Sequence, residues 1–340
     1  MLDNNAMRAG ATVLVTGGTG FVGAYVIRDL VKAGYKVKAI RRKPTVPAFI
    51  QTEISRQVQW IDCDILDIAG LESAMENTDT VIHSAAVVSF NPEHKRQMFA
   101  TNVEGTENIV NAALEKNVRR FVHVSSVATL GKKKDGSVVT EKSTWQESKL
   151  NTNYAISKNM AEMHVWRGIA EGLNGIIVNP STILGYGDWN TSSNALFRNV
   201  YDGFKWYSSG GTGFVDVEDV SAAIVQLMAT NIHSERFILN GENWSYKKLL
   251  DTIADGFKKS RPSLEATPFL AGIAWRFEKL KSLITGKKIL LSRESATIAQ
   301  SNTKFDNSKI LAALPGFRFT NLEHTIQNAC LQYATQKILK

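Results

Sequence analysis

Short apolar runs alternate with longer amphipathic stretches from residue 11 to about residue 180. A short apolar run is typical of a buried strand, and an apolar residue at every third or fourth position is typical of a helix. Strands that alternate with helices indicate a parallel sheet, because a parallel crossover needs a long connection. The pattern therefore predicts a doubly wound α/β sheet with helices on both faces. The expected strands are residues 11–16, 36–40, 58–61, 80–83, 121–124 and 175–178, and the expected helices are residues 20–33, 71–77, 102–116 and 153–171.

The alternation ends after Pro180. Residues 185–194 are rich in Gly, Ser, Asn and Trp, and residues 208–213 have the sequence SSGGTG; we expect both to be loops of the kind that line clefts. Residues 237–239 are expected to form a return strand, and the chain beyond them is expected to be mostly helical. We therefore expect a sheet domain of residues 8–180 with a return segment near 214–240, and a smaller, mainly helical lobe of residues 181–213 and 241–340.

The composition of the 340 residues is that of an ordinary globular protein, with 44% hydrophobic residues and a formal charge of +8. Only 24 Gly, 7 Pro and 2 Cys are present, which excludes a disordered chain, a collagen-like repeat and a disulfide framework. No Cys or His spacing resembles a metal site, so no metal is expected. No run of 18 apolar residues occurs, and we expect a cytoplasmic protein without a transmembrane segment.

The positive charge is concentrated in residues 258–293, which hold nine basic and two acidic residues. Within this segment an apolar stripe recurs at helical spacing, formed by Leu270, Ile273, Phe277, Leu280 and Ile284. A helix packed on the protein body, a lid over the substrate, and a helix resting on an acidic membrane surface all fit this pattern. No nucleic-acid-reading motif accompanies the basic residues, so nucleic acid is not expected as a partner.

Glycines at positions 17, 20 and 23 follow the first expected strand and open the first expected helix. Such a turn needs residues without a Cβ, so that backbone N–H groups and the helix N-terminus can approach a pyrophosphate. The spacing alone is common, but its place between strand and helix predicts a dinucleotide site.

Arg41 lies 18 residues after Gly23, near the end of the second expected strand. Enzymes that use NAD place a carboxylate about 20 residues beyond the glycines, where it binds the ribose hydroxyls. This chain has the sequence Ile-Arg-Arg-Lys there instead. A guanidinium is suited to a 2′-phosphate. We therefore expect NADP(H) to be preferred, with NAD(H) as the alternative.

Tyr154 and Lys158 are four residues apart and share one face of an expected helix. An ammonium at this spacing can lower the pKa of the phenol and reach the cofactor ribose, which makes the phenol usable as a proton donor. The pairs Tyr201/Lys205 and Tyr333/Lys337 have the same spacing. Position favours Tyr154, because its helix follows the fifth strand, which ends in Ser125-Ser126, and ligands bind at the carboxyl ends of such strands.

Together these residues resemble the extended short-chain dehydrogenase/reductase family. The resemblance runs from about Ala11 to the FDNSK stretch at 305–309, and its motifs are GGTGFVG (17–23), Asp64-Ile65, HSAA (83–86), VSS (124–126), YAISK (154–158), Asn179-Pro180-Ser181 and FVDVEDV (214–220). It implies a Rossmann-type cofactor domain, a catalytic set of Ser126, Tyr154 and Lys158, and a homodimer. It also implies cofactor binding by Gly17, Thr19, Gly20, Phe21, Val22, Gly23, Arg41, Asp64, Ile65, Ala85, Ala86, Tyr154, Lys158 and Pro180, with Asp64 and Ile65 at the adenine and Pro180 beside the nicotinamide.

The family contains carbonyl reductases, similar to dihydroflavonol reductase and the 3β-hydroxysteroid dehydrogenases, and nucleotide-sugar epimerases or dehydratases. Arg41 favours a reductase that exchanges NADP(H). Thr212 favours it too, because sugar-nucleotide members usually carry an Arg there. Gly131 replaces the Asn of dihydroflavonol reductases, so that substrate is not named. Aromatic and apolar residues indicate an apolar or aromatic small-molecule substrate: Val87, Val88, Phe90, Trp189, Phe204, Trp206 and Tyr207. An epimerase with bound NAD and an NADPH-sensing scaffold are the alternatives.

Overall fold

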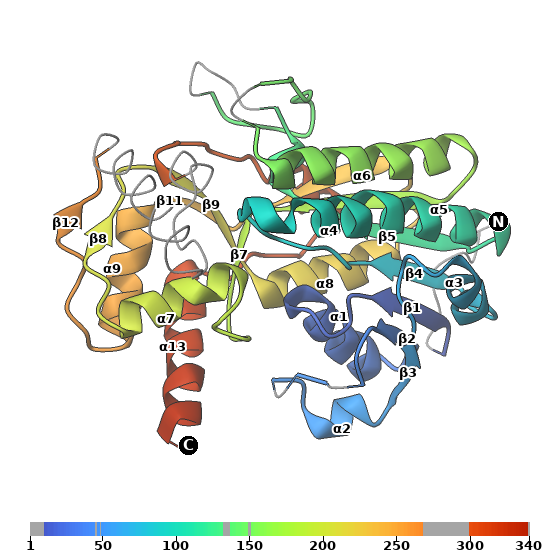
Figure 1. The fold of residues 1–340 in the computed structure, drawn as a ribbon, viewed down its shortest axis with the longest axis horizontal. Coiled ribbons are helices and arrows are strands. Elements are labelled where there is room, and N and C mark those ends of the chain that lie inside the picture. The colour runs from blue at the N-terminus through green and yellow to red at the C-terminus, as the bar shows by residue number, and fades with distance from the viewer. Residues whose placement is uncertain are drawn as a thin grey trace.

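A computed structural model describes residues 10–338 except 45, 48, 132–136, 149–150 and 268–298. Seven parallel strands form the main sheet, in the order β10-β6-β5-β4-β1-β2-β3 (Figure 1). The doubly wound sheet predicted from the sequence, including the return strand, is confirmed. The strands are β1 (Thr12–Thr16), β2 (Lys36–Arg41), β3 (Val58–Asp62), β4 (Thr80–His83), β5 (Arg120–Val124), β6 (Gly175–Pro180) and β10 (Glu235–Leu239).

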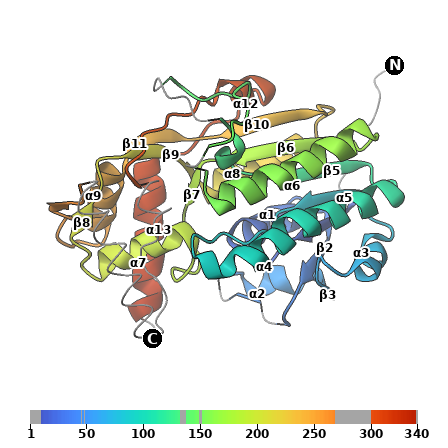
Figure 2. The same ribbon diagram turned by 45° about the horizontal axis from the view of Figure 1, so that its top comes forward.

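Helices cover both faces of this sheet (Figure 1). One face carries α1 (Phe21–Lys32) and α8 (Val217–Met228), which pack against each other, together with α12 (Ser308–Ala313). Figure 2 shows α12 beside the edge strand β10. The other face carries α3 (Ile68–Met75), α4 (Lys95–Phe99), the π-helical turn η2 (Ala100–Glu104), α5 (Gly105–Glu115) and α6 (Asn153–Ala170), and the short α2 (Thr52–Ser55) follows β2.

The strand order reverses between β1 and β4, because β2 and β3 lie on one side of β1 and β4, β5 and β6 on the other. Ligands of doubly wound sheets bind at such a reversal, beyond the carboxyl ends of the strands. The glycine turn follows β1, and the Ser125-Ser126 pair follows β5. The topology therefore brings the residues singled out in the sequence to one edge of the sheet.

The second, smaller part of the molecule contains helices and two small sheets (Figure 1). One sheet has the order β11-β9-β7 and the other pairs β12 with β8. The elements are β7 (Thr182–Leu184), α7 (Ala195–Tyr201), β8 (Trp206–Tyr207), β9 (Gly211–Asp216), β11 (Glu242–Ser245), α9 (Tyr246–Gly256), β12 (Leu264–Glu265) and α13 (Leu322–Ile338). The expectation of a loop over 208–213 is wrong for its second half, since Gly211–Gly213 open β9.

Those glycines are required by close packing rather than by a turn. A Cβ on Gly213 would lie 2.0 Å from Oδ1 of Asn240, and one on Gly211 would lie 2.7 Å from the carbonyl oxygen of Trp244. Glycine in a strand commonly marks such an approach. The apolar stripe expected between Leu270 and Ile284 lies outside the described residues.

Phe121 of β5 tests how much the packing on the α5/α6 face stabilises the fold. Its side chain is fully buried among residues of β1, α3, α5 and α6. We expect Phe121→Ala to lower the free energy of unfolding by about 3–5 kcal/mol, because it leaves a cavity that the neighbours fill only in part. Urea denaturation measures this. Leu331→Ala on α13 is the control, since Leu331 is 64% exposed; a similar loss there would contradict the argument.

Candidate active site

The turn between β1 and α1 is closed around its glycines. Gly17 has a φ of +69°, and its carbonyl oxygen accepts a hydrogen bond of 2.8 Å from the N–H of Gly20. A Cβ on Gly23 would lie 2.2 Å from that oxygen. The first turn of α1 has no capping side chain and no acidic residue. Its N–H groups and positive dipole therefore suit the phosphates of a dinucleotide, as the glycine spacing predicted.

The loop after β4 touches this turn. The N–H of Ala85 donates to Oγ1 of Thr16 at 3.2 Å, and a Cβ on Gly17 would lie 2.7 Å from the same nitrogen. Ala86 follows in the same loop and is exposed. Pro180 is the last residue of β6, two strands away in the sheet. The structure thus brings the turns after β1 and β4 into contact, at the point where the strand order reverses.

Thr19, Phe21 and Val22 complete the glycine motif, and each is partly exposed. The Phe21 ring meets Tyr25 edge-on, with the centroids 5.9 Å apart. Of the two residues matched to the adenine position, Asp64 is exposed and accepts a hydrogen bond from the N–H of Leu66. Ile65 is 5% exposed and packs in the core. Only Asp64 therefore offers its side chain freely to solvent.

Arg41 ends β2, next to the strand that leads into the glycine turn. Its Nε donates to Oδ1 of Asp62 at 2.6 Å, its Nη1 donates to the carbonyl oxygen of Pro44 at 3.0 Å, and its guanidinium lies 5.7 Å from the centre of the Trp60 ring. Trp60 in turn lies near Gly18 of the turn. These contacts hold the guanidinium in a fixed position at the edge where the cofactor is expected.

Ser126, Tyr154 and Lys158 converge at the carboxyl end of β5. The hydroxyls of Ser126 and Tyr154 are hydrogen bonded to each other, and Nζ of Lys158 donates to the carbonyl oxygen of Val124 at 2.9 Å. Thr152 caps α6 by accepting a hydrogen bond from the N–H of Ala155, so Tyr154 lies in the first turn of the helix. The position of the Tyr154 hydroxyl next to Ser126 therefore depends on the start of α6 at Asn153.

Burial shifts the protonation of both groups. It raises the pKa of Tyr154, and the hydroxyl of Ser126 opposes this shift. It lowers the pKa of Lys158 to about 8, and the carboxylate of Glu162 opposes that shift. The phenol is therefore protonated near neutral pH, the state in which it can donate a proton. Here Ser126, rather than Lys158, is the group that favours the phenolate.

The two adjacent serines face different partners. Oγ of Ser125 donates to Oε2 of Glu162 at 2.6 Å and is buried, whereas Ser126 reaches Tyr154 and accepts a hydrogen bond from the N–H of Ala128. The backbone direction at the end of β5 thus separates two residues that the sequence leaves nearly equivalent.

The other two Tyr/Lys pairs do not form such a site. The ring of Tyr201 packs against Trp189 and Phe257, and the hydroxyl of Tyr333 accepts a hydrogen bond of 3.0 Å from the N–H of Gly187. Tyr333 is 5% exposed and belongs to the core of the smaller lobe. These two tyrosines have the same spacing to a lysine as Tyr154, but their rings pack in the smaller lobe and form no such site.

Of the aromatic residues that the sequence indicated for the substrate pocket, the structure places only some near the catalytic candidates. Phe90 lies edge-on to the Tyr154 ring at 6.1 Å, so it borders the catalytic candidates. Trp189 stacks on Tyr333 at 5.4 Å and packs against the core of the lobe. Phe204 and Trp206 are 47% and 40% exposed.

Sequence reasoning missed two buried polar residues beside this site. Asn102 of η2 accepts a hydrogen bond from the N–H of Val87 at 2.7 Å and donates to Oγ of Ser157 at 3.0 Å, which joins the loop after β4 to α6. Glu162 lies one helical turn beyond Lys158 and is 2% exposed. A charged residue on the same face as Tyr154 and Lys158 could have indicated it. His83, the last residue of β4, is hydrogen bonded to Thr16 and Thr106.

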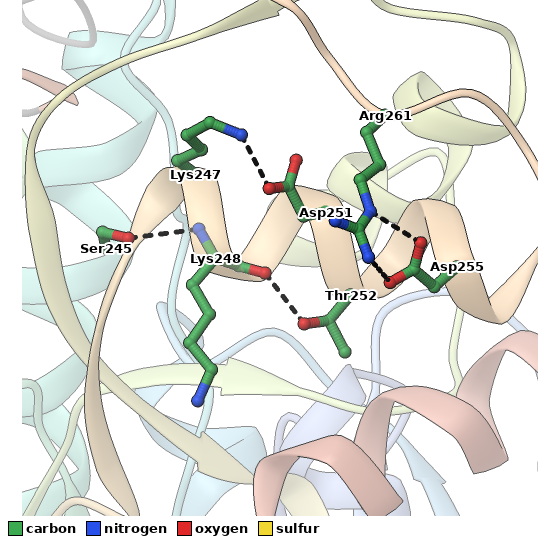
Figure 3. A pocket seen from close by; sticks show the side chains of 7 residues that line it. All are labelled: Ser245, Lys247, Lys248, Asp251, Thr252, Asp255 and Arg261. Carbon is green, nitrogen blue, oxygen red and sulfur yellow. Dashed lines mark hydrogen bonds and ion pairs between the residues drawn. The ribbon is translucent and has the colours of Figure 1, made fainter.

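A hollow on α9 carries charged groups that are already paired (Figure 3). Lys247 is 2.7 Å from Asp251, and Arg261 binds both carboxylate oxygens of Asp255. Ser245 caps the helix. This hollow is explained by ion pairs on the solvent-facing side of α9, whose other side is buried in the lobe. Among the described residues, no cluster could hold a metal ion and no helix is long and apolar enough to cross a membrane.

The fold and the convergent Ser, Tyr and Lys side chains define a dinucleotide-dependent oxidoreductase of the extended short-chain dehydrogenase/reductase type. A sequence profile of the NAD dependent epimerase/dehydratase family matches residues 13–239. The chain belongs to this family, which confirms the resemblance and the prediction of an enzyme acting on hydroxyl or carbonyl groups.

Two related sequences and one solved structure illustrate what the chain is similar to. Sterol demethylase protein B of Methylococcus capsulatus is 31% identical over 269 residues, which cover 77% of this chain and 80% of that protein. A putative dihydroflavonol 4-reductase of Synechocystis is 32% identical over 244 residues, which cover 69% of each chain. The crystal structure of gox2253 superposes with a TM-score of 0.81 at 26% identity and covers 96% of this chain and 99% of that one.

Proposed function

We propose that this protein is an NADP(H)-dependent reductase that converts the ketone or aldehyde of a small apolar or aromatic compound to the alcohol. The observation that carries the proposal is the hydrogen-bonded pair of Ser126 and Tyr154, with the ring of Phe90 beside the phenol. The names of the two relatives refer to a sterol and a dihydroflavonol, both ring compounds with large apolar surfaces. These names support an apolar substrate.

The cofactor would be bound by the glycine turn, the end of β2 and the first turns of α6. The N–H groups at the start of α1 would bind the pyrophosphate, and Gly17 and Gly23 leave room for its approach. Arg41 would bind the 2′-phosphate, and Lys158 the nicotinamide ribose. The reduced cofactor supplies the hydride. We also propose the homodimer that the family resemblance implies.

The protein groups then manage the proton. Ser126 would donate a hydrogen bond to the carbonyl oxygen of the substrate and hold it beside the phenol. Tyr154, protonated because burial raises its pKa, would donate its proton to the alkoxide as negative charge develops on that oxygen. The hydroxyl of Ser126 would favour the phenolate left behind, and Lys158, when charged, would hold the nicotinamide ribose beside it. The reverse reaction uses the same groups in the opposite order.

An epimerase with captive NAD is the second candidate, and the name of the family supports it. Thr212, where sugar-nucleotide members usually carry Arg, pairs with Trp244 inside the small sheet of the lobe. The test is the loss of reduced-nicotinamide absorbance, with NADPH and with NADH, over aldehydes, ketones, steroids and sugar nucleotides. Consumption with an apolar carbonyl supports the reductase. A sugar nucleotide that changes configuration without added cofactor would refute it.

Arg41→Ala tests the cofactor preference. We expect the KM for NADPH to rise about 10- to 100-fold, because a charge-assisted contact to the phosphate is lost, while the KM for NADH stays nearly unchanged. Initial rates with each cofactor measure this. Lys36→Ala is the matched control, since it removes one positive charge at the other end of β2. Equal changes for both cofactors would show that Arg41 does not contact the 2′-phosphate.

A further inference from the structure

Glu162 is a buried carboxylate at the centre of a hydrogen-bond network behind the catalytic candidates. It is 2% exposed. Its Oε2 accepts from Ser125, Thr129 and Asn179 at 2.6–3.0 Å, and its Oε1 accepts from Trp166 at 3.3 Å and Arg236 at 3.2 Å. These donors come from the ends of β5 and β6, from the 3₁₀ turn η3 (Val127–Thr129), from β10 and from α6 itself. One side chain therefore joins four parts of the fold to the catalytic helix.

Both oxygens of Glu162 accept hydrogen bonds from groups that can only donate. An indole N–H, a guanidinium and a side-chain amide nitrogen can only donate. Trp166 and Arg236 donate to one oxygen, and Asn179 donates to the other. Oε1 therefore accepts only from groups that cannot accept a hydrogen bond, whereas Oε2 also meets the hydroxyls of Ser125 and Thr129. Burying a charged side chain costs desolvation free energy, which these hydrogen bonds offset only in part. We therefore expect Glu162 to serve the site beside it.

The network reaches Ser126 through its backbone. The amide nitrogen of Asn179 lies within hydrogen-bond distance of three acceptors: Oε2 of Glu162 at 3.0 Å, Oγ1 of Thr129 at 3.0 Å and the carbonyl oxygen of Ser126 at 3.1 Å. Ser125, the neighbouring residue, donates to the same carboxylate oxygen. The peptide that carries the Ser126 hydroxyl is thus held from both sides, which fixes the hydroxyl against Tyr154.

Glu162 also lies four residues after Lys158 on α6, one helical turn along, and its charge raises the pKa of that lysine. The other titratable groups near Lys158 are Tyr154 on the same helix and His83 and His123 on β4 and β5. Burial lowers the pKa of His83 to about 3 and that of His123 well below its ordinary value, so both are neutral at pH 7. The carboxylate of Glu162 is therefore the negative charge that opposes the desolvation of Lys158.

We propose that Glu162 is a positioning residue for the reductase reaction: its hydrogen bonds with Ser125 and Asn179 fix the backbone at Ser126, and its carboxylate, one helical turn from Lys158, stabilises the ammonium of that lysine. This inference rests on the proposed function, because it takes Lys158 to be a residue of the reductase site. The effect of Glu162 on the pKa of Lys158 can nevertheless be measured without turnover.

The direct test is the titration of Lys158 in the full chain, with lysine labelled at Cε with ¹³C and followed by NMR. Loss of one resonance in Lys158→Met assigns the signal. The wild-type midpoint is expected at about pH 8. In Glu162→Gln, which keeps the size of the side chain and removes its charge, we expect the midpoint about one pH unit lower, since a nearby opposite charge favours the ammonium. An unchanged midpoint overturns the proposal.

Two further variants separate charge from packing. Ser125→Ala removes a hydrogen bond to the same carboxylate but keeps its charge, so the midpoint of Lys158 should stay in place. If Glu162→Gln does not fold, Arg236→Gln serves instead. It removes the cation that partly neutralises Glu162, and the midpoint should rise. A midpoint that stays fixed in Arg236→Gln also overturns the proposal.

The pH profile of kcat/KM gives the matching kinetic result. The wild-type rate should fall as pH rises through about 8, where Lys158 loses its proton, and in Glu162→Gln this limb should move to lower pH by the same amount as the NMR midpoint. Asp219→Asn on the opposite face of the sheet is the control, a buried carboxylate whose loss should leave the limb in place. If no carbonyl is reduced but the NMR midpoint shifts, the proposed function fails and the role of Glu162 stands.

Discussion

Tyr154→Phe is expected to lower kcat for carbonyl reduction by about 100- to 10,000-fold, the range for loss of a general acid, while the affinity for NADPH stays nearly unchanged. The substitution removes one oxygen atom and keeps the ring that meets Phe90 edge-on. The alkoxide would then take its proton from water, without a fixed donor. Steady-state kinetics and fluorescence titration of NADPH measure the two quantities.

Tyr201→Phe is the matched control for this experiment. Tyr201 also has a lysine four residues later, but its ring packs in the lobe against Trp189 and Phe257, contacts that phenylalanine retains. We expect it to keep wild-type kcat. Retained activity in Tyr154→Phe, or an equal loss in both variants, would contradict the assignment of the proton donor.

Gly23→Ala is expected to weaken the binding of both NADPH and NADH by about 10- to 100-fold, the equivalent of 1–3 kcal/mol of steric strain. A Cβ at this position would lie 2.2 Å from the carbonyl oxygen of Gly17 and 2.9 Å from Oγ of Ser84. The carbonyl must shift, and it closes the turn by accepting the N–H of Gly20. Isothermal titration with each cofactor measures the loss.

Gly172→Ala separates this local effect from a general loss of stability. Gly172 has a φ of +108°, so alanine is strained there, but nothing lies within 4 Å of the added Cβ. The variant should unfold at a lower urea concentration and bind both cofactors as the wild type does. A similar loss of affinity in Gly172→Ala would mean that the turn at Gly23 is not specifically required.

Much of the main sheet could be predicted because its strands are buried on both faces. The strands β4, β5 and β6 have no exposed residue, and such strands appear in the sequence as continuous apolar runs. The smaller sheets could not be predicted in the same way. Strand β8 has two residues, and β9 begins with glycines whose small size serves a close approach to Asn240 and Trp244.

The amino-acid sequence by itself determined the doubly wound sheet, the glycine turn and the three side-chain types Ser, Tyr and Lys, because these depend on local periodicity and on residues without a Cβ. The sequence also favoured Tyr154 and Ser126 over the alternatives, but only the tertiary structure showed the contacts themselves: the hydrogen bond between Ser126 and Tyr154, and the network of Glu162 behind them. Those contacts join β5, α6, β6 and β10, and the residues that they link are 17 to 74 positions apart in the chain. Distance along the sequence carries no information about them, whereas the parallel register of the strands brings their ends together at one edge.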